Sequence, residues 1–305
     1  MGLYGGIDRI LIDAIQSRPL TTPAARAWFV DGTNGANTNA GTKEAPLLSI
    51  GQAITNAGAT RGDVVIIAPG TYTITAALVP LKNMSFIAGL QTNPRKPSVI
   101  ITGNIADLIQ IDVDGVYFEG IEIKASGATA DNLVDIADTA ATAGAGFFRC
   151  VFNGADQTSV KAINLSDATF AASEMFVKEC LFRDLTGTCI DVGVLGMAYS
   201  YIGYNQFAID VNTGVGIALA DTSAFATGKA YVIEHNAVTG FDATADEVFI
   251  TIAGTENTTG AGIIRRNDCA YMAAAAVTID KLSLSQVQNY YGDAATGGTL
   301  VDPGT

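Results

Sequence analysis

A loose repeat in the second half of the chain constrains the fold more than any other feature. Its unit has the form apolar-x-x-[Cys/Asn]-x-apolar, and successive fourth positions lie 22 to 31 residues apart. Such a repeat indicates stacked coils, because one coil cannot bury its apolar face alone. The clear copies are FFRCVF (147–152), VKECLF (177–182), IGYNQF (202–207), IEHNAV (233–238) and IRRNDC (264–269), with FEGIEI (118–123) and QVQNYY (286–291) as weaker relatives.

Composition agrees with a single β domain. Among 305 residues there are 33 glycines, 15% are charged and 49% are hydrophobic, which excludes a disordered chain and a long-helix protein. From residue 63 onward, short β-branched runs are separated by Gly, Asn or Asp, without the intervening helices that a βαβ fold needs. The fold class predicted is all-β.

Stacking makes residues one repeat apart direct neighbours, because parallel strands lie about 4.8 Å apart. We therefore expect an internal stack of Phe152, Phe182 and Phe207, with Cys150 over Cys180 as small core residues. The asparagines of the repeat suit a turn, where Asn tolerates the left-handed conformation and its amide can hydrogen-bond to the next coil. They are Asn205, Asn236, Asn267 and Asn289.

The regions flanking the repeat define two further expectations. We assign residues 1–27 as an N-terminal arm and 28–305 as the repeat domain, with a short helix at 47–57 and the C-terminal stretch covering its ends. The arm has apolar residues at helical spacing, which is typical of either a docking or oligomerisation segment or an ordinary capping helix. The residues assigned to docking are Leu3, Ile7, Ile10, Leu11 and Ile15.

Two features together resemble the right-handed parallel β-helix, or pectin-lyase-like, proteins. One is the segment WFVDGTNGANTNAGTKEAPLLSIGQAI followed by GDVVIIAPGTYTI, and the other is the run of repeats, so that residues 28–291 are covered. The resemblance implies one right-handed parallel β-helix of about nine coils. It does not specify an activity, because the fold hosts lyases, hydrolases, isomerases, phage tailspikes and adhesins.

Charge and cysteine usage exclude several function classes. A net charge of −13 and a pI near 4.3 argue against nucleic-acid and anionic-membrane partners. No stretch approaches a membrane span, and the start of the chain has no Sec-type signal pattern. Four cysteines without C-x-x-C and one histidine give poor material for zinc, and we expect no cofactor. Cys189 and Cys269 are interpreted as core residues.

The catalytic motifs that the resemblance would imply are missing. A polygalacturonase-like enzyme would need an Asp-Asp pair and Gly-His-Gly, whereas this chain has no Asp-Asp and its histidine lies in Glu234-His235-Asn236. A pectate-lyase-like enzyme would need Arg-x-Pro-x-x-Arg, but Ile100 stands in place of the second arginine after Arg95.

The repeat still creates one polar column, from the residues just before each Cys or Asn. On successive coils, several of these would lie within about 15 Å of one another. A lyase could use a Tyr or His base with an Arg, but a surface ladder of matched charges, such as Arg149 over Glu179, is the favoured interpretation. The column contains Arg149, Glu179, Tyr204, His235, Arg266 and Gln288.

Two regions of the chain have oxygen ligands of the kind that Ca²⁺ prefers. The loop after residue 30 could bind a cation through Asp31, and a set of carboxylates recurs along the chain. Turn formation explains both more simply, because Asp side chains make local hydrogen bonds in turns. The recurring carboxylates are Asp112, Asp114, Asp131, Asp135, Asp138 and Asp191.

Two functions of different class remain open from the sequence. The first is a non-enzymatic phage virion protein (capsid decoration, head spike or tail component) that is assembled in the host cytoplasm as a homotrimer, binds other virion proteins and contacts host polysaccharide. The resemblance to phage-associated β-helices, the arm and the missing motifs favour it. The second is a polysaccharide lyase or hydrolase with catalytic residues unlike those of the family.

Overall fold

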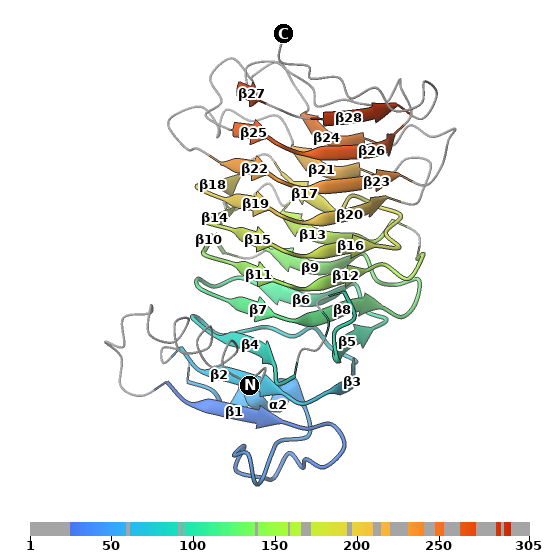
Figure 1. Cartoon of the computed structure of the whole chain (residues 1–305). Coiled ribbons are helices and arrows are strands. Elements are labelled where there is room, and N and C mark those ends of the chain that lie inside the picture. Colours follow the sequence, from blue (N-terminus) through green and yellow to red (C-terminus); the bar gives the residue numbers. More distant parts are fainter. Residues whose placement is uncertain are drawn as a thin grey trace, which may run out of the picture.

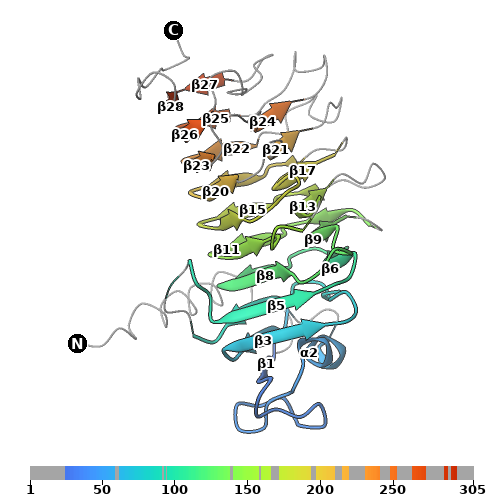
Figure 2. The same ribbon diagram turned by 90° about the vertical axis from the view of Figure 1, so that its right-hand side faces the viewer.

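The computed structural model has one rod of stacked coils (Figures 1 and 2). Residues 1–24, which carry the proposed docking residues, lie outside the part that it describes. The described residues are 25–58, 62–90, 93, 95–137, 140–157, 159–165, 172–193, 197–209, 215–219, 231–240, 248–252, 263–272, 285–287 and 290–293.

Three long parallel sheets form the sides of the rod, and a complete coil contributes one strand to each of them. Sheet A has ten strands: β1 (Ala27–Val30), β2 (Val64–Ile67), β4 (Ser85–Ala88), β7 (Tyr117–Glu119), β11 (Gly146–Phe148), β15 (Phe176–Lys178), β19 (Tyr201–Gly203), β22 (Val232–Glu234), β25 (Ile263–Arg265) and β27 (Ser285–Val287). Sheet B has nine: β3 (Gly70–Ile74), β5 (Val99–Gly103), β8 (Ile121–Ala125), β12 (Val151–Asn153), β16 (Leu181–Arg183), β20 (Gln206–Ile209), β23 (Ala237–Gly240), β26 (Asp268–Met272) and β28 (Tyr290–Asp293).

The third side is shorter, and a small sheet lies beside it. Sheet C contains β6 (Asp107–Ile111), β9 (Asn132–Ile136), β13 (Lys161–Leu165), β17 (Ile190–Val192), β21 (Val215–Leu219) and β24 (Val248–Ile252). The three-stranded sheet contains β10 (Thr142–Ala143), β14 (Ala172–Ser173) and β18 (Met197–Ala198). The single parallel β-helix is confirmed. Six coils of the described part have strands on all three sides, so the figure of about nine coils stays a prediction.

The interior contains the predicted aromatic stack. Phe182 lies between Phe152 and Phe207, with ring centroids 4.8 Å and 4.6 Å apart, because the register pairs these residues on neighbouring strands of sheet B. Cys150 and Cys180 are buried at equivalent positions, as expected, and Cys189 is also buried. The side chain of Cys269 lies outside the described part.

One helix, α2 (Ile50–Asn56), lies beside β1 at the N-terminal end of the rod (Figure 2). The prediction of a helix over 47–57 was too long at its start. Ser49 ends the preceding loop as the N-cap, its hydroxyl accepting from the Gln52 N–H. Leu47 instead forms a parallel bridge with Val30 and donates its N–H to the Phe29 carbonyl. No helix in the described part is long and apolar enough to cross a membrane.

Candidate functional site

The polar column lies at the sharp corner between sheets A and B. Its residues have left-handed backbones, with φ of 53° at Arg149, 55° at Glu179, 58° at Tyr204, 55° at His235 and 54° at Arg266. The sequence prediction placed this conformation one residue later, at the asparagines, and was wrong. The corner contains two residues, and the left-handed one is the partly exposed first residue, while the asparagine that follows is buried.

Asn205, Asn236 and Asn267 form the ladder that the sequence predicts, whereas Asn289 lies outside the described part. The Asn205 side-chain amide donates to Asn236 Oδ1 at 3.0 Å, and the Asn236 amide donates to Asn267 Oδ1 at 2.9 Å. Each amide oxygen also accepts the backbone N–H of the preceding coil, as Asn205 Oδ1 does from Cys180 at 2.9 Å. This ladder satisfies buried backbone groups at a corner that has no regular strand pairing.

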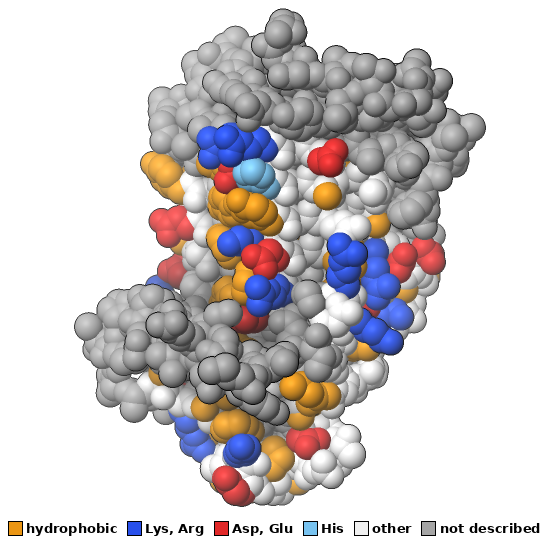
Figure 3. Space-filling view, viewed as in Figure 1, with side chains coloured by type: hydrophobic (Ala, Val, Ile, Leu, Met, Phe, Trp, Pro, Cys, Tyr) orange, Lys and Arg blue, Asp and Glu red, His pale blue; other side chains and the backbone are white. Residues whose placement is uncertain are grey.

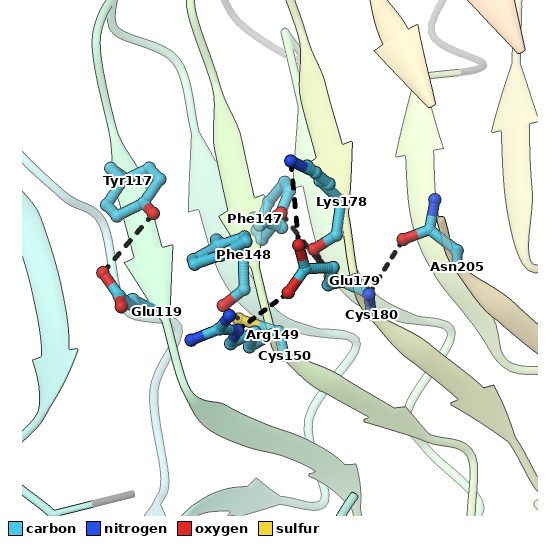
Figure 4. A network of polar contacts seen from close by, with 10 residues as sticks. All are labelled: Tyr117, Glu119, Phe147, Phe148, Arg149, Cys150, Lys178, Glu179, Cys180 and Asn205. Carbon is cyan, nitrogen blue, oxygen red and sulfur yellow. Dashed lines mark hydrogen bonds and ion pairs between the residues drawn. The ribbon is translucent and has the colours of Figure 1, made fainter. Parts of the chain in front are cut away.

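On the outside of the corner, charged and aromatic groups are matched between coils. Arg149 Nε lies 2.8 Å from Glu179 Oε2, which confirms the predicted pairing of these two residues (Figure 4). The Tyr204 ring stacks on His235 with centroids 4.8 Å apart and planes 8° apart. Basic, imidazole, hydrophobic and acidic side chains follow one another along this face (Figure 3). Gln288 lies outside the described part.

Sheet A presents a second row beside this column. Arg265 Nε lies 2.6 Å from Glu234 Oε2, and the Tyr201 hydroxyl donates to Glu234 Oε1 at 3.2 Å. The Tyr201 side chain lies across Gly203, where a Cβ would meet its hydroxyl oxygen, so a larger residue at this position would have to displace the Tyr201 ring. Burial, followed by the Glu234 charge, raises the pKa of Tyr201 to about 12, and this phenol is therefore protonated at neutral pH.

Nearer the N-terminal end of sheet A, Tyr117 and Glu119 on β7 lie together on the same face (Figure 4). Burial raises the pKa of the Tyr117 phenol, and burial also raises the pKa of the Glu119 carboxyl against the opposing charge of Arg149. The Tyr117 hydroxyl therefore donates to Glu119, at 3.4 Å, rather than acting as a base.

The acidic candidates have separate partners. Asp31 forms a turn, in which its carboxylate accepts from the Thr33 and Asn34 N–H groups. These hydrogen bonds lower the pKa of Asp31, and the one from the Asn34 side chain has the largest effect. Asp114 pairs with Lys82 at 2.7 Å, and Asp191 pairs with Lys161 at 2.6 Å. Asp135 accepts from Asn164 at 2.7 Å, whereas Asp138 lies outside the described residues. No group of three or more His, Cys, Asp or Glu residues suited to a metal occurs in the described part.

The outer face of sheet B carries a polar network that the sequence pattern did not indicate. Glu122, only 5% exposed, accepts from Asn153 Nδ2 and from Arg183 Nη2, both at 2.9 Å. Arg183 lies two coils from Glu122, so the pairing depends on three strands at once. The only available signal was the outward position of all three residues, which is ordinary for polar side chains.

We predict an acid-dependent contribution of Glu234 to stability. Burial raises the pKa of Glu234, but the hydrogen bond and charge of Arg265 outweigh it and hold the net pKa below its ordinary value of 4.5. A lowered folded-state pKa stabilises above the unfolded-state pKa, and this stabilisation is lost as the pH falls through the folded-state value. Glu234→Gln should therefore reduce the urea-unfolding free energy by about 0.5–1 kcal/mol near pH 7, with the difference disappearing near pH 3.

Glu44→Gln is the matched control, because Glu44 is exposed. It should change stability by less than about 0.5 kcal/mol at either pH. A Glu234→Gln effect that stays constant with pH would assign the loss to packing and contradict the prediction.

Comparisons with known proteins support the fold. Residues 33–78 match a family model described as a protein of unknown function, DUF1565. No curated protein matches the chain significantly in sequence. Among solved structures, the chain resembles the pectin methylesterase from Aspergillus niger, at 12% identity and a TM-score of 0.55 over 91% of this chain and 88% of that one.

Two further solved structures are similar. One is a rhamnogalacturonan lyase, at 12% identity and a TM-score of 0.53 over 81% of this chain and 69% of that one. The other is a PL6 family alginate lyase, at 13% identity and a TM-score of 0.52 over 89% of this chain and 41% of that one. Similarity at this identity establishes the fold alone, so the chain has the pectin-lyase-like right-handed parallel β-helix fold.

Proposed function

We propose that the chain is a non-enzymatic structural protein of a bacteriophage virion, as a capsid decoration, head spike or tail component that contacts host-surface glycans. The matched corner column is the observation that carries the non-enzymatic part. Arg149 is paired with Glu179, and Tyr204 is stacked on His235. Groups engaged in this way stabilise the stacking of coils, whereas a catalytic base has to reach a substrate proton.

Sequence features support the proposal that the rod is attached to a virus particle. The apolar arm ahead of the β-helix, residues 1–27, is the proposed docking or oligomerisation segment, and it joins the rod to other virion proteins as a homotrimer assembled in the host cytoplasm. In this proposal the rod has about nine coils. Helix α2 caps its N-terminal end, which is consistent with the burial of Ile50, Ala53 and Ile54 against the first strands.

A polysaccharide lyase or hydrolase is the second candidate. The solved structures similar in fold bear the names of enzymes: a pectin methylesterase, a rhamnogalacturonan lyase and an alginate lyase. In this candidate His235 or Tyr204 would take a proton, and Arg266, the next residue of the column, would neutralise a carboxylate.

A polysaccharide-cleavage assay separates the two candidates. The full chain is incubated with pectate, alginate and rhamnogalacturonan, with and without Ca²⁺, and unsaturated and reducing ends are measured. We expect no product. Reproducible product that is lost in His235→Ala or Arg266→Ala, and kept in the matched surface variant Lys43→Gln, would overturn the non-enzymatic role.

The virion assignment needs its own measurement. Native mass determination and electron microscopy with an antibody to the chain should place a trimer on a capsid or tail. Recovery of the chain free of particles would overturn this part of the proposal.

A further inference from the structure

A hollow on the outer face of sheet B has the chemistry of a ligand site. It is open to solvent, has a volume of about 410 Å³ and lies where β3, β5 and β8 stack; these three strands are on the right of Figure 1. Its polar wall consists of Thr71, Thr102, Lys124 and Ser126, and Gln157 joins them from the segment after β12. A hollow of this volume is in the usual range for small-molecule sites.

The strand register explains why these side chains share one surface. Thr102 on β5 pairs with Lys124 on β8, so both side chains leave the same face of sheet B one coil apart. Thr71 pairs with Ile100 in the adjacent row. Residues more than 50 positions apart in the sequence thus line a single hollow, which the coil repeat brings together.

The polar groups of the hollow are open to a ligand. In the described part of the chain, Lys124 Nζ has no hydrogen-bond or ion-pair partner, and the same is true of the Thr71, Thr102 and Ser126 hydroxyls. The Gln157 amide nitrogen donates to the Ala155 carbonyl at 2.9 Å, which leaves its side-chain oxygen as an acceptor.

The charges around the hollow leave Lys124 uncompensated. Glu122 is the nearest acid on the same strand, but Arg183 and Asn153 bind its Oε1, both at 2.9 Å. Asp156 is exposed and lies outside ion-pair distance of Lys124. The unpaired ammonium gives this hollow a local positive charge, which attracts an anion against the net charge of −13 of the whole chain.

We propose that this hollow binds an anionic sugar residue, through Lys124 and the surrounding hydroxyls. Lys124 pairs with the carboxylate or sulfate of the sugar, a charge-assisted contact stronger than a neutral hydrogen bond. The threonine and serine hydroxyls and Gln157 exchange hydrogen bonds with sugar hydroxyls. Ile100 and Ala155 supply apolar surface for the C–H face of the ring. The site specifies the chemistry of the host-surface glycan contact proposed above, and it rests on that part of the proposed function.

The test measures binding of methyl glucuronide, glucose 6-sulfate and methyl glucoside to the full chain by saturation-transfer NMR and calorimetry at low salt. We expect at least one of the two anionic sugars to bind. The neutral glucoside should bind about tenfold more weakly than that anionic sugar. The two anionic arms distinguish a carboxylate from a sulfate preference. Equal binding of all three sugars, or no binding of either anion, would overturn the proposal.

Variants locate the site. Lys124→Gln should weaken anion binding about tenfold, and Thr102→Val should weaken it severalfold for charged and neutral sugars alike. Lys43→Gln is the matched control, because it removes one exposed lysine charge in the loop before α2 and should leave binding unchanged. Circular dichroism checks that each variant is folded. Lys124→Gln binding as tightly as the parent chain would exclude this hollow as the site.

The failures of the two proposals are distinguishable. Absence of sugar binding overturns this site and the glycan contact, and leaves the structural role in the virion untouched. Cleavage of polysaccharide in the assay described above overturns that role, while the binding measurement still stands.

Discussion

Replacing Asn236 by alanine should destabilise the rod by about 2–5 kcal/mol. Asn236 is 1% exposed and is the middle member of the asparagine ladder. Its Oδ1 accepts from both the Asn205 N–H and the Asn205 side-chain amide, each at 3.0 Å. Alanine leaves the Asn205 N–H buried without an acceptor and leaves the Asn205 side-chain amide with only the Val177 carbonyl, and each buried N–H that loses its acceptor costs about 1–3 kcal/mol. Urea unfolding followed by circular dichroism gives the change in free energy.

The neighbouring corner residue is the control for this substitution. His235→Asn keeps a residue type that tolerates the left-handed conformation, and it removes only the partly exposed ring that stacks on Tyr204. It should cost about 1 kcal/mol or less. If Asn236→Ala were as mild as His235→Asn, the ladder would not be a source of stability.

Phe182→Ala should cost about 3–5 kcal/mol, the range for a buried phenylalanine. Phe182 is fully buried between Phe152 and Phe207, and its ring lies within 4.8 Å and 4.6 Å of theirs. The substitution removes buried apolar surface, opens a cavity and interrupts the stack on both sides. The urea midpoint and the thermal unfolding temperature should both fall.

An exposed aromatic on the same coil provides the comparison for the core. Phe176 on β15 is 36% exposed and stacks on Tyr201 at 5.8 Å. Phe176→Ala should therefore cost about 1 kcal/mol. If both variants lost the same unfolding free energy, the internal stack would contribute no more to stability than a partly exposed aromatic pair.

The repeat allowed contacts along one column to be predicted, because residues at equal positions in successive coils must become neighbours. The Phe152–Phe182–Phe207 stack and the Arg149–Glu179 pair follow from this spacing alone. The left-handed residue was misplaced because spacing does not say which of two corner residues takes that conformation. Helix α2 was predicted too long, since the bridge of Leu47 to Val30 is a contact between distant segments.

The repeat by itself determined that the chain stacks coils, which side chains fill the interior and which polar residues form a column. A coil that cannot bury its own apolar face has no other stable arrangement. Only the tertiary structure decided what lies between columns. The Glu122–Arg183 pair and the hollow around Lys124 join residues from different rows and different coils. Such contacts depend on strand register and on the path of the connecting segments, and neither is written in the spacing of the repeat.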